Sequence, residues 1–252
     1  MIEYRVEGGA ARITLNRPEK RNALNQALIE ALKARLAAAG EDPQARVILL
    51  SGRGKDFCAG LDIGALAESK EADMLEALAD ARKLADLFAG MRRNPRPIVA
   101  AVQGRALGGG CGIATACDLI LAAESAQFGY PEIGMGFVPA VVAAMLKDTV
   151  PEKLMLELAL TGEPISAPDA LRAGMINRVF PDAEFSAGVE AYVSALAAKS
   201  KSALSLTKNL LYQVQGLPFE KAIEAGIQAN AAGRMTPDFR EGVARFANKP
   251  RS

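Results

Sequence analysis

The feature of this sequence that most constrains its fold is the alternation of short apolar runs with longer helical segments. The runs RVILLS (46–51), PIVAAV (97–102) and DLILA (118–122) have the length and composition of buried strands. A segment with helical spacing precedes each of the first two runs, at 24–40 and 66–93. Strands that alternate with helices form parallel sheets through right-handed crossovers. The sequence therefore predicts an α/β fold.

Weaker signals extend this pattern toward both ends of the core. Residues 11–15 alternate between apolar and polar side chains, which favours a strand, and 176–180 have the composition of a last strand. Asn22 is a candidate N-cap for the helix at 24–40, and Gly40 is a candidate stop. Strands are thus expected on both sides of the helical segments.

Beyond Pro181 the pattern is almost wholly helical. Helical spacing covers 183–199, 203–215, 219–231 and 237–247. Such a tail forms either a small second domain or an oligomerisation element.

Length and charge narrow the class of protein. A chain of 252 residues that is 50% hydrophobic suits one globular domain with a small appendage. A net charge of +1 gives no electrostatic footprint for nucleic acid or an anionic membrane. The N-terminus lacks the pattern of a signal peptide, and no apolar run is long enough to span a bilayer. Three cysteines in apolar contexts favour buried thiols in a reducing cytoplasm.

The chain contains no histidine, which removes whole classes of chemistry. Ser-His-Asp and Cys-His catalysis are excluded, as are histidine-ligated metal sites. Three scattered cysteines also argue against a zinc site made of cysteine alone, so no metal is expected. Carboxylates, lysine, tyrosine and cysteine remain as candidates for proton transfer.

The stretch GRALGGGCGI (104–113) follows an apolar run and precedes a helix-like segment. Its spacing does not match G-x-G-x-x-G, and no Gly-Lys-Ser/Thr follows, so it is neither a dinucleotide fingerprint nor a P-loop. A strand, a glycine turn and a helix start expose unpaired N–H groups to an approaching oxygen, as in one half of an oxyanion hole. A tight turn that needs glycine for φ > 0 or for close packing is the alternative.

A second glycine-containing loop, DFCAGLDI (56–63), also follows an apolar strand. Its backbone could supply the second N–H donor of an oxyanion hole. Because such strand-to-loop junctions are common in α/β proteins, the two loops alone leave both interpretations open.

Glu132 is the candidate acid–base residue. It stands in QFGYPEIGMG, among Tyr130, Pro131 and Ile133. Apolar surroundings disfavour the ionised carboxylate and raise its pKa, which suits a proton shuttle near neutral pH. The alternative is a turn glutamate that faces water. The acids of the 66–93 segment have the pattern of a solvated helix face.

Several motifs occur in a fixed order along nearly the whole chain. They are LNRPEKRNALN, GKDFCAGLDI, PIVAAVQGRALGGGCGIATACDLILAAESAQFGYPEIGMGFVPA, TGEPISAPDALRAGMINRVFP, SALSLTKNLL and GVARFANKP. In this order and spacing the chain resembles the crotonase (enoyl-CoA hydratase/isomerase) superfamily. The resemblance implies an α/β, crotonase-like spiral of ββα units over residues 1–195. It also implies a helical trimerisation and lid region over 196–252, and assembly as a homotrimer or a dimer of trimers.

The resemblance further implies an acyl-CoA substrate whose thioester oxygen is held by two backbone N–H groups. By motif position these belong to Leu61 and Gly109, with Glu132 as catalytic acid–base residue. Coenzyme A enters as part of the substrate, and no separate cofactor is implied. The residues that the resemblance assigns to CoA binding are Lys20, Arg21, Ala23, Leu24, Ala59, Asp62, Ile63, Phe246 and Lys249. Ordinary surface cations are the alternative for Lys20, Arg21 and Lys249.

One position departs from the hydratase pattern of this family. Hydratases carry a second glutamate three residues beyond the oxyanion glycine, where this chain has Gly112. Hydration uses two carboxylates to handle water and the Cα proton, whereas moving a double bond needs only one base. The expected reaction is therefore Δ3,Δ2-enoyl-CoA isomerisation with Glu132 as the single base. Gly112 alternatively enlarges the pocket for a bulkier acyl chain.

Other activities remain open at this stage. Hydration is possible if an acid from residues 62–80 replaces the missing one, and thioester hydrolysis or decarboxylation occurs on the same scaffold in this family. A CoA-binding or RNA-binding scaffold subunit is the non-enzymatic alternative, and the balanced charge argues against RNA. The expected partners are thus an acyl-CoA and further copies of the chain, with neither nucleic acid nor membrane.

Overall fold

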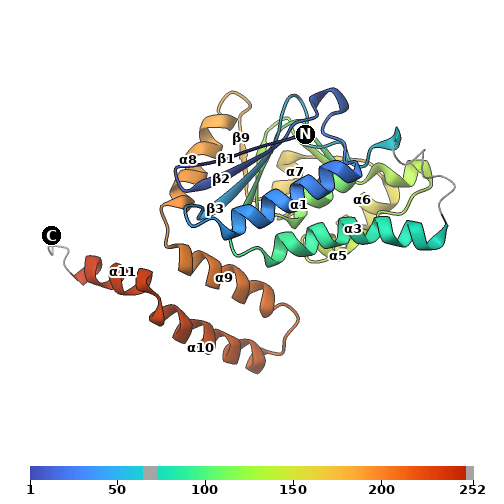
Figure 1. The fold of residues 1–252 in the computed structure, drawn as a ribbon. Coiled ribbons are helices and arrows are strands. Elements are labelled where there is room, and N and C mark those ends of the chain that lie inside the picture. Colours follow the sequence, from blue (N-terminus) through green and yellow to red (C-terminus); the bar gives the residue numbers. More distant parts are fainter. Residues whose placement is uncertain (65–72, 248–252) are drawn as a thin grey trace.

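The protein is built around a six-stranded sheet (Figure 1). The computed structural model describes residues 1–64 and 73–247. Within these residues the strand order is β1-β2-β3-β4-β6-β9, and every neighbouring pair except β1 and β2 is parallel. The strands are β1 (Ile2–Glu7), β2 (Ala10–Leu15), β3 (Val47–Gly52), β4 (Ile98–Val102), β6 (Leu119–Ala123) and β9 (Arg178–Phe180). The predicted α/β core is confirmed, and the expected strands are present at every position that was named.

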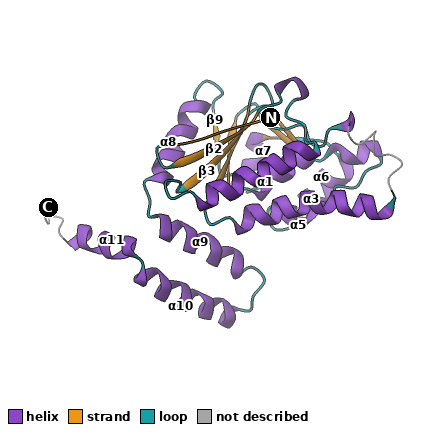
Figure 2. Cartoon of the chain, viewed as in Figure 1, coloured by secondary structure: helices purple, strands orange, loops and turns teal. Residues whose placement is uncertain are grey.

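Helices connect these strands and cover the sheet (Figure 2). The helices of the core are α1 (Gln26–Glu41), α3 (Met74–Arg93), α4 (Gly109–Ala116), α5 (Ala140–Leu146), α6 (Glu152–Thr161), α7 (Ala167–Arg172) and α8 (Phe185–Ala197). Two 3-10 turns lie at Pro18–Lys20 and Pro131–Met135. The first part of the helical segment predicted at 66–93 falls on residues outside the described ones, and α3 accounts for the remainder.

A second, smaller sheet contains the strands that lead into the two predicted catalytic segments, at Gly109 and Glu132. It consists of β5 (Arg105–Leu107), β7 (Gln127–Gly129) and β8 (Ile165–Ser166) in the order β5-β7-β8. β5 and β7 are parallel, with Leu107 opposite Gly129. The sequence did not predict this sheet, because two or three residues carry too little periodicity to register as a strand.

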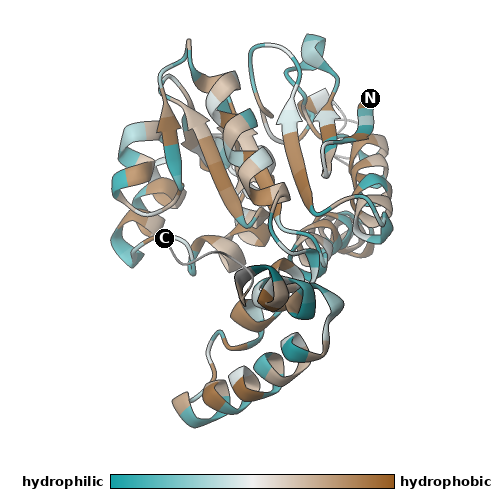
Figure 3. Cartoon of the chain, turned by 90° about the vertical axis from the view of Figure 1, so that its left-hand side faces the viewer, coloured by the Kyte–Doolittle hydropathy of each residue, from teal (hydrophilic) through white to brown (hydrophobic). Residues whose placement is uncertain are grey.

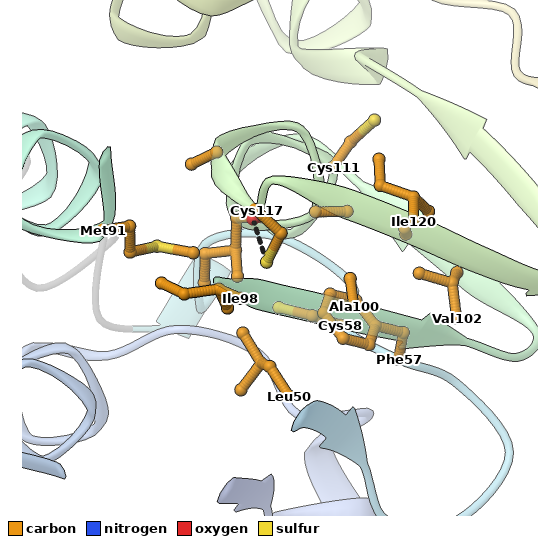
Figure 4. Close-up of a cluster of buried hydrophobic side chains, with 14 of the residues drawn as sticks. Leu50, Phe57, Cys58, Met91, Ile98, Ala100, Val102, Cys111, Cys117 and Ile120 are labelled. Atoms are coloured by element: carbon orange, nitrogen blue, oxygen red, sulfur yellow. Dashed lines mark hydrogen bonds between the residues drawn. The ribbon is translucent and has the colours of Figure 1, made fainter. Parts of the chain in front are cut away.

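Two hydrophobic clusters hold the layers together. One face of the large sheet packs against α1 and α3 around side chains that include Ile48, Leu50 and Ile98, part of which Figure 4 shows. On the opposite face, Val189 and Val193 of α8 pack against Val47, Leu49 and Val99. The strands are correspondingly hydrophobic along most of their length (Figure 3). The central strands β3, β4 and β6 are buried on both faces, as expected for parallel strands with continuous apolar runs.

The start of α1 differs from the expectation. Asn25 is the N-cap, since its side chain accepts a hydrogen bond from the Leu28 N–H at 2.9 Å, so the assignment of Asn22 was wrong. Asn22 is instead completely buried, and its amide donates to the carbonyl oxygens of Asp56 and Phe57 at 2.9 and 3.1 Å. Both are asparagines before the same helix, and only tertiary contacts distinguish them.

The predicted helical tail is present and projects away from the sheet (Figure 1). Beyond α8 it consists of α9 (Lys201–Gln213), α10 (Phe219–Met235) and α11 (Pro237–Ala247). α9 is fixed to the core by Lys208, whose ammonium lies 2.8 Å from Asp118 and donates to the Met91 carbonyl at 3.0 Å. Among residues 1–64 and 73–247, none of the helices combines the length and hydropathy that a bilayer span requires.

Candidate active site

The two predicted catalytic segments meet at the carboxyl ends of β5 and β7. The Gly108 N–H donates to the Gly129 carbonyl at 2.8 Å, which extends the pairing one residue beyond the strands. α4 begins directly after Gly108, and the turn that holds Glu132 begins directly after Tyr130. The sheet register thus places the start of α4 beside the Glu132 turn.

Gly108 is the N-cap of α4 and has φ +53°, a left-handed conformation that glycine adopts most readily. A Cβ at this residue would lie 2.7 Å from Glu132 Oε1, so the missing side chain leaves room for the carboxylate. The Gly109 N–H occupies the first turn of the helix and has no acceptor among the described residues. It is therefore available to an oxygen of a ligand.

The loop that contains Leu61 lies against the start of α4. A Cβ on Gly109 would be 3.8 Å from Leu61 Cγ and 3.3 Å from Leu24 Cδ1. The Leu61 N–H also has no acceptor in the described part of the chain. Gly60 has φ +95°, and a Cβ there would lie 2.9 Å from the Leu107 carbonyl, so only glycine allows this close approach. The structure thus brings the two predicted donors together.

Glu132 is buried, with 8% of its surface exposed. Burial raises the pKa of its carboxyl above the ordinary value. Its Oε2 atom is inaccessible and has no hydrogen-bond partner among the described residues. The alternative of a solvent-facing turn glutamate is therefore wrong. A buried carboxylate with one unpaired oxygen, near two free N–H donors, is suited to removing a proton from a carbon beside a carbonyl.

The space beside Gly112 is occupied by apolar side chains. A Cβ at this residue would lie 2.6 Å from Val142 Cγ1 of α5 and 2.8 Å from Phe88 Cζ of α3. Both side chains are almost completely buried, and α4 packs against both helices. The expectation that Gly112 enlarges the pocket is thus not met, because these two side chains fill the volume.

The described acids of residues 62–80 are engaged elsewhere. Asp62 lies 3.1 Å from the Arg17 guanidinium, and Asp73 caps α3 in a capping box with Glu76. Asp80 pairs with Lys83. Glu68 and Glu71, which share this segment, lie outside the described residues. Among the described acids, none takes the place of the carboxylate that Gly112 lacks.

Seven of the nine residues assigned to CoA binding form two adjoining segments. Lys20 and Arg21 are exposed, while Ala23 and Leu24 are buried. Segment 59–63 lies alongside them through hydrogen bonds from the Ala59 N–H to the Arg21 carbonyl (3.0 Å) and from the Asp62 N–H to the Leu24 carbonyl (2.9 Å). Because these two N–H groups are occupied, a CoA contact at Ala59 or Asp62 uses the carbonyl or the side chain. Ile63 is 62% exposed at the edge of the segment.

The remaining assigned residues belong to the end of the tail. Phe246 lies in α11, the last described helix, and Lys249 lies outside the described residues.

Several residues at the site were not identified from the sequence. Arg17 and Asn22 link the two segments assigned to CoA binding, and Phe88 and Val142 pack beside Gly112. Tyr130 is fully buried below the carboxylate turn, and its hydroxyl has no hydrogen bond to a described residue. Arg17 of LNRP and Asn22 of RNALN could have been identified from the sequence, because polar side chains that become buried need hydrogen-bond partners.

A separate groove of about 410 Å³ lies on the outer face of the large sheet, beside α8. Two of its arginines are paired, Arg12 with Glu190 and Arg53 with Glu3. The groove does not include Leu61, Gly109 or Glu132. The described residues contain no cluster of acids and cysteines arranged to hold a metal ion.

Known proteins share this architecture. The family model described as enoyl-CoA hydratase/isomerase matches residues 5–252. The 2,3-dehydroadipyl-CoA hydratase of Escherichia coli is 35% identical over 238 residues, which cover 94% of this chain and 91% of that protein. A crystal structure of an enoyl-CoA hydratase from Mycobacterium smegmatis has a TM-score of 0.92 at 32% identity, covering 99% of this chain and 97% of that one.

A crystal structure of human enoyl Coenzyme A hydratase domain-containing protein 3 has a TM-score of 0.94 at 28% identity, covering 99% of this chain and 98% of that one. These matches span both sheets and the helical tail, and they confirm the crotonase-like fold that the motifs predicted. They also identify the protein as an enzyme of the crotonase superfamily. The chain belongs to the enoyl-CoA hydratase/isomerase family.

Proposed function

We propose that this protein is a Δ3,Δ2-enoyl-CoA isomerase with Glu132 as its single acid–base residue. The observation that carries the proposal is the packing at Gly112, where a Cβ would lie 2.6 Å from Val142 Cγ1 and 2.8 Å from Phe88 Cζ, so that a second carboxylate would require both side chains to shift. Glu132 remains as a buried carboxylate with a raised pKa. One base suffices for a proton shuttle, because the proton that leaves the substrate is the one that returns.

In the proposed mechanism the thioester oxygen accepts hydrogen bonds from the Leu61 and Gly109 N–H groups. Ionised Glu132 removes a proton from C2 of a 3-enoyl-CoA, and the electrons of that C–H bond form a dienolate. The two N–H groups stabilise the negative charge on oxygen. Protonated Glu132 then delivers the proton to C4, and the double bond moves from C3–C4 to C2–C3. No cofactor takes part, and coenzyme A acts only as the carrier of the acyl group.

Comparison of the wild type with Glu132→Gln tests this mechanism. The variant keeps the size of the side chain and loses the base, so kcat on a 3-enoyl-CoA is expected to fall by about 10²–10⁴-fold. Double-bond migration is followed by the absorbance of the conjugated 2-enoyl thioester. Undiminished turnover by Glu132→Gln would contradict the role of Glu132.

Hydration is the second candidate, because the Escherichia coli relative is named as a 2,3-dehydroadipyl-CoA hydratase. Its test is the wild-type rate of water addition to 2-enoyl-CoA substrates, measured beside the isomerase rate. A hydration rate above the isomerase rate would overturn the proposed order of the two reactions. Thioester hydrolysis and decarboxylation are tested by the same substrate panel, and CoA binding without any turnover would favour a scaffold role.

We extend the proposal to assembly as a homotrimer or a dimer of trimers. Phe219, Ile223 and Ile227 follow one another at four-residue intervals on α10, and each is at least half exposed. An apolar stripe of this kind calls for a covering surface.

The three free, buried cysteines agree with a reducing compartment, which supports placement in the cytoplasm.

A further inference from the structure

The position of the Leu61 N–H depends on how its loop is held against the segment before α1. The Leu24 N–H donates to the Gly60 carbonyl at 2.7 Å, and the Asp62 N–H donates to the Leu24 carbonyl at 2.9 Å. Since backbone groups alternate sides along an extended chain, the N–H of Leu61 points away from Leu24. The direction of this donor is therefore set by the pairing of its two neighbours with Leu24.

One side chain bridges the two paired segments. The Arg17 guanidinium donates to the Ala23 carbonyl at 2.6 Å and to Asp62 Oδ2 at 3.1 Å. Ala23 precedes Leu24, and Asp62 follows Leu61, so the contacts lie immediately beside the pairing. The side chains of Arg17 and Asp62 are only 13% and 15% exposed, which limits screening of the ion pair by water.

Arg17 is itself held in place by its backbone. Its N–H donates to Asn22 Oδ1 at 2.9 Å, and its carbonyl accepts the N–H groups of Lys20 and Asn22. Arg21 and Asn22 both have left-handed backbone conformations, with φ of 51° and 56°. Two consecutive non-glycine residues in this region are uncommon and persist where surrounding contacts fix them. The turn that carries Arg17 is thus a rigid support.

We propose that Arg17 is a positioning residue for the oxyanion hole, acting through Ala23 and Asp62 to fix the Leu61 N–H. Its planar guanidinium is suited to this task, because it offers several donors in a fixed geometry, whereas a lysine ammonium is a flexible point charge. The inference rests on the proposed role of Leu61 as a donor to the thioester oxygen. It does not depend on whether the enzyme catalyses isomerisation or hydration.

A 3-oxoacyl-CoA such as acetoacetyl-CoA tests the donor directly, since its enolate absorbs in the near ultraviolet and is favoured by an oxyanion hole. The apparent pKa for enolisation of the bound compound is measured for wild type, Arg17→Ala and Arg17→Lys. We expect this pKa to rise by about one unit in Arg17→Ala, which is a tenfold weaker preference for the enolate, and by less in Arg17→Lys. On the preferred substrate we expect kcat to fall by about 10–10²-fold, with KM changed by less than about threefold, since removing a whole donor costs about 10²–10³-fold.

Arg12→Ala is the matched control, because Arg12 also pairs with a carboxylate at a similar exposure, 16%, but lies in the outer groove. Its enolisation pKa and kcat should equal those of the wild type. The affinity for free CoA should stay within about threefold in Arg17→Ala, because Asn22 still fixes segment 21–23 through its own hydrogen bonds.

Three results would overturn the proposal. They are an unchanged enolisation pKa in Arg17→Ala, an equal change in Arg12→Ala, or a loss of CoA affinity as large as the loss of kcat. If Arg17→Ala does not fold, Arg17→Lys decides by the same criteria. A wild-type enzyme that does not favour the enolate at all would instead contradict the oxyanion hole itself, which separates the two proposals.

Discussion

Replacing Gly112 by alanine tests whether the position of the missing carboxylate is closed. Alanine in place of a helical glycine ordinarily stabilises a protein by about 1 kcal/mol. Here the added Cβ would lie 2.6 Å from Val142 Cγ1 and 2.8 Å from Phe88 Cζ. Overpacking a buried site costs about 1–3 kcal/mol. We therefore expect Gly112→Ala to leave the free energy of unfolding unchanged or to lower it by up to about 2 kcal/mol.

Gly90→Ala is the matched control. Gly90 lies within α3, and a Cβ added there would have nothing within 4 Å. It should show the full stabilisation of about 1 kcal/mol. The two variants should thus differ by about 1–3 kcal/mol in urea or thermal unfolding followed by circular dichroism. Equal stabilisation would show that the space at Gly112 is open, and the structural case against a second carboxylate would fall.

Phe88 provides an independent check on the same contact. In a double-mutant cycle, Gly112→Ala should cost less in the Phe88→Ala background than in the wild type, because the ring that it meets is gone. If the two substitutions show no coupling, the destabilisation by Gly112→Ala does not come from its contact with Phe88.

Four further predictions concern the site and its surroundings. Because burial raises the pKa of Glu132, kcat/KM should fall on acidification with a midpoint above the ordinary value of about 4.3 for a glutamate. The folded state also binds this proton more tightly than the unfolded chain does, so the stability of Glu132→Gln relative to wild type should increase as pH rises through the raised pKa; a constant difference in unfolding midpoints between about pH 4 and 8 would contradict this. Gly108→Ala places a Cβ 2.7 Å from the Glu132 carboxylate at φ +53°, and activity should fall at least about tenfold with CoA affinity retained; an active variant would show that the carboxylate works from elsewhere. Burial raises the pKa of Cys58 and of Cys111 to about 12, so iodoacetamide at about pH 8 should label neither in the folded protein and both in urea, as mass spectrometry can show.

The sequence predicted correctly those features that depend on the composition of a single segment. The strands β3, β4 and β6 are continuous apolar runs, and the structure has them where they were expected. The burial of Glu132 follows the apolar composition of its neighbours. Features that depend on contacts between distant segments could not be read in this way. Phe88 and Val142 approach Gly112 from two separate helices. The small sheet depends on pairing between short strands that are distant in sequence.

Asn22 illustrates the same limit. Its local context, a polar residue ahead of a helix, matches an N-cap as well as Asn25 does. Only the fold shows that Asn22 satisfies buried carbonyl groups of the loop at 53–57. The local sequence correctly indicated that Asn22 makes side-chain hydrogen bonds to the backbone, but it predicted the start of the helix as the partner instead of the loop at 53–57.

The pairing of Leu107 with Gly129 has a consequence for how this scaffold diversifies. The register of these two short strands fixes the position of Gly109, the proposed donor to the carbonyl oxygen, relative to Glu132, the proposed acid–base residue. Under the proposed mechanism this spacing governs formation of the enolate, and the other residues of the site govern what the enolate becomes. Gly112 lies in α4, outside this pairing, so a substitution there would leave this register unchanged.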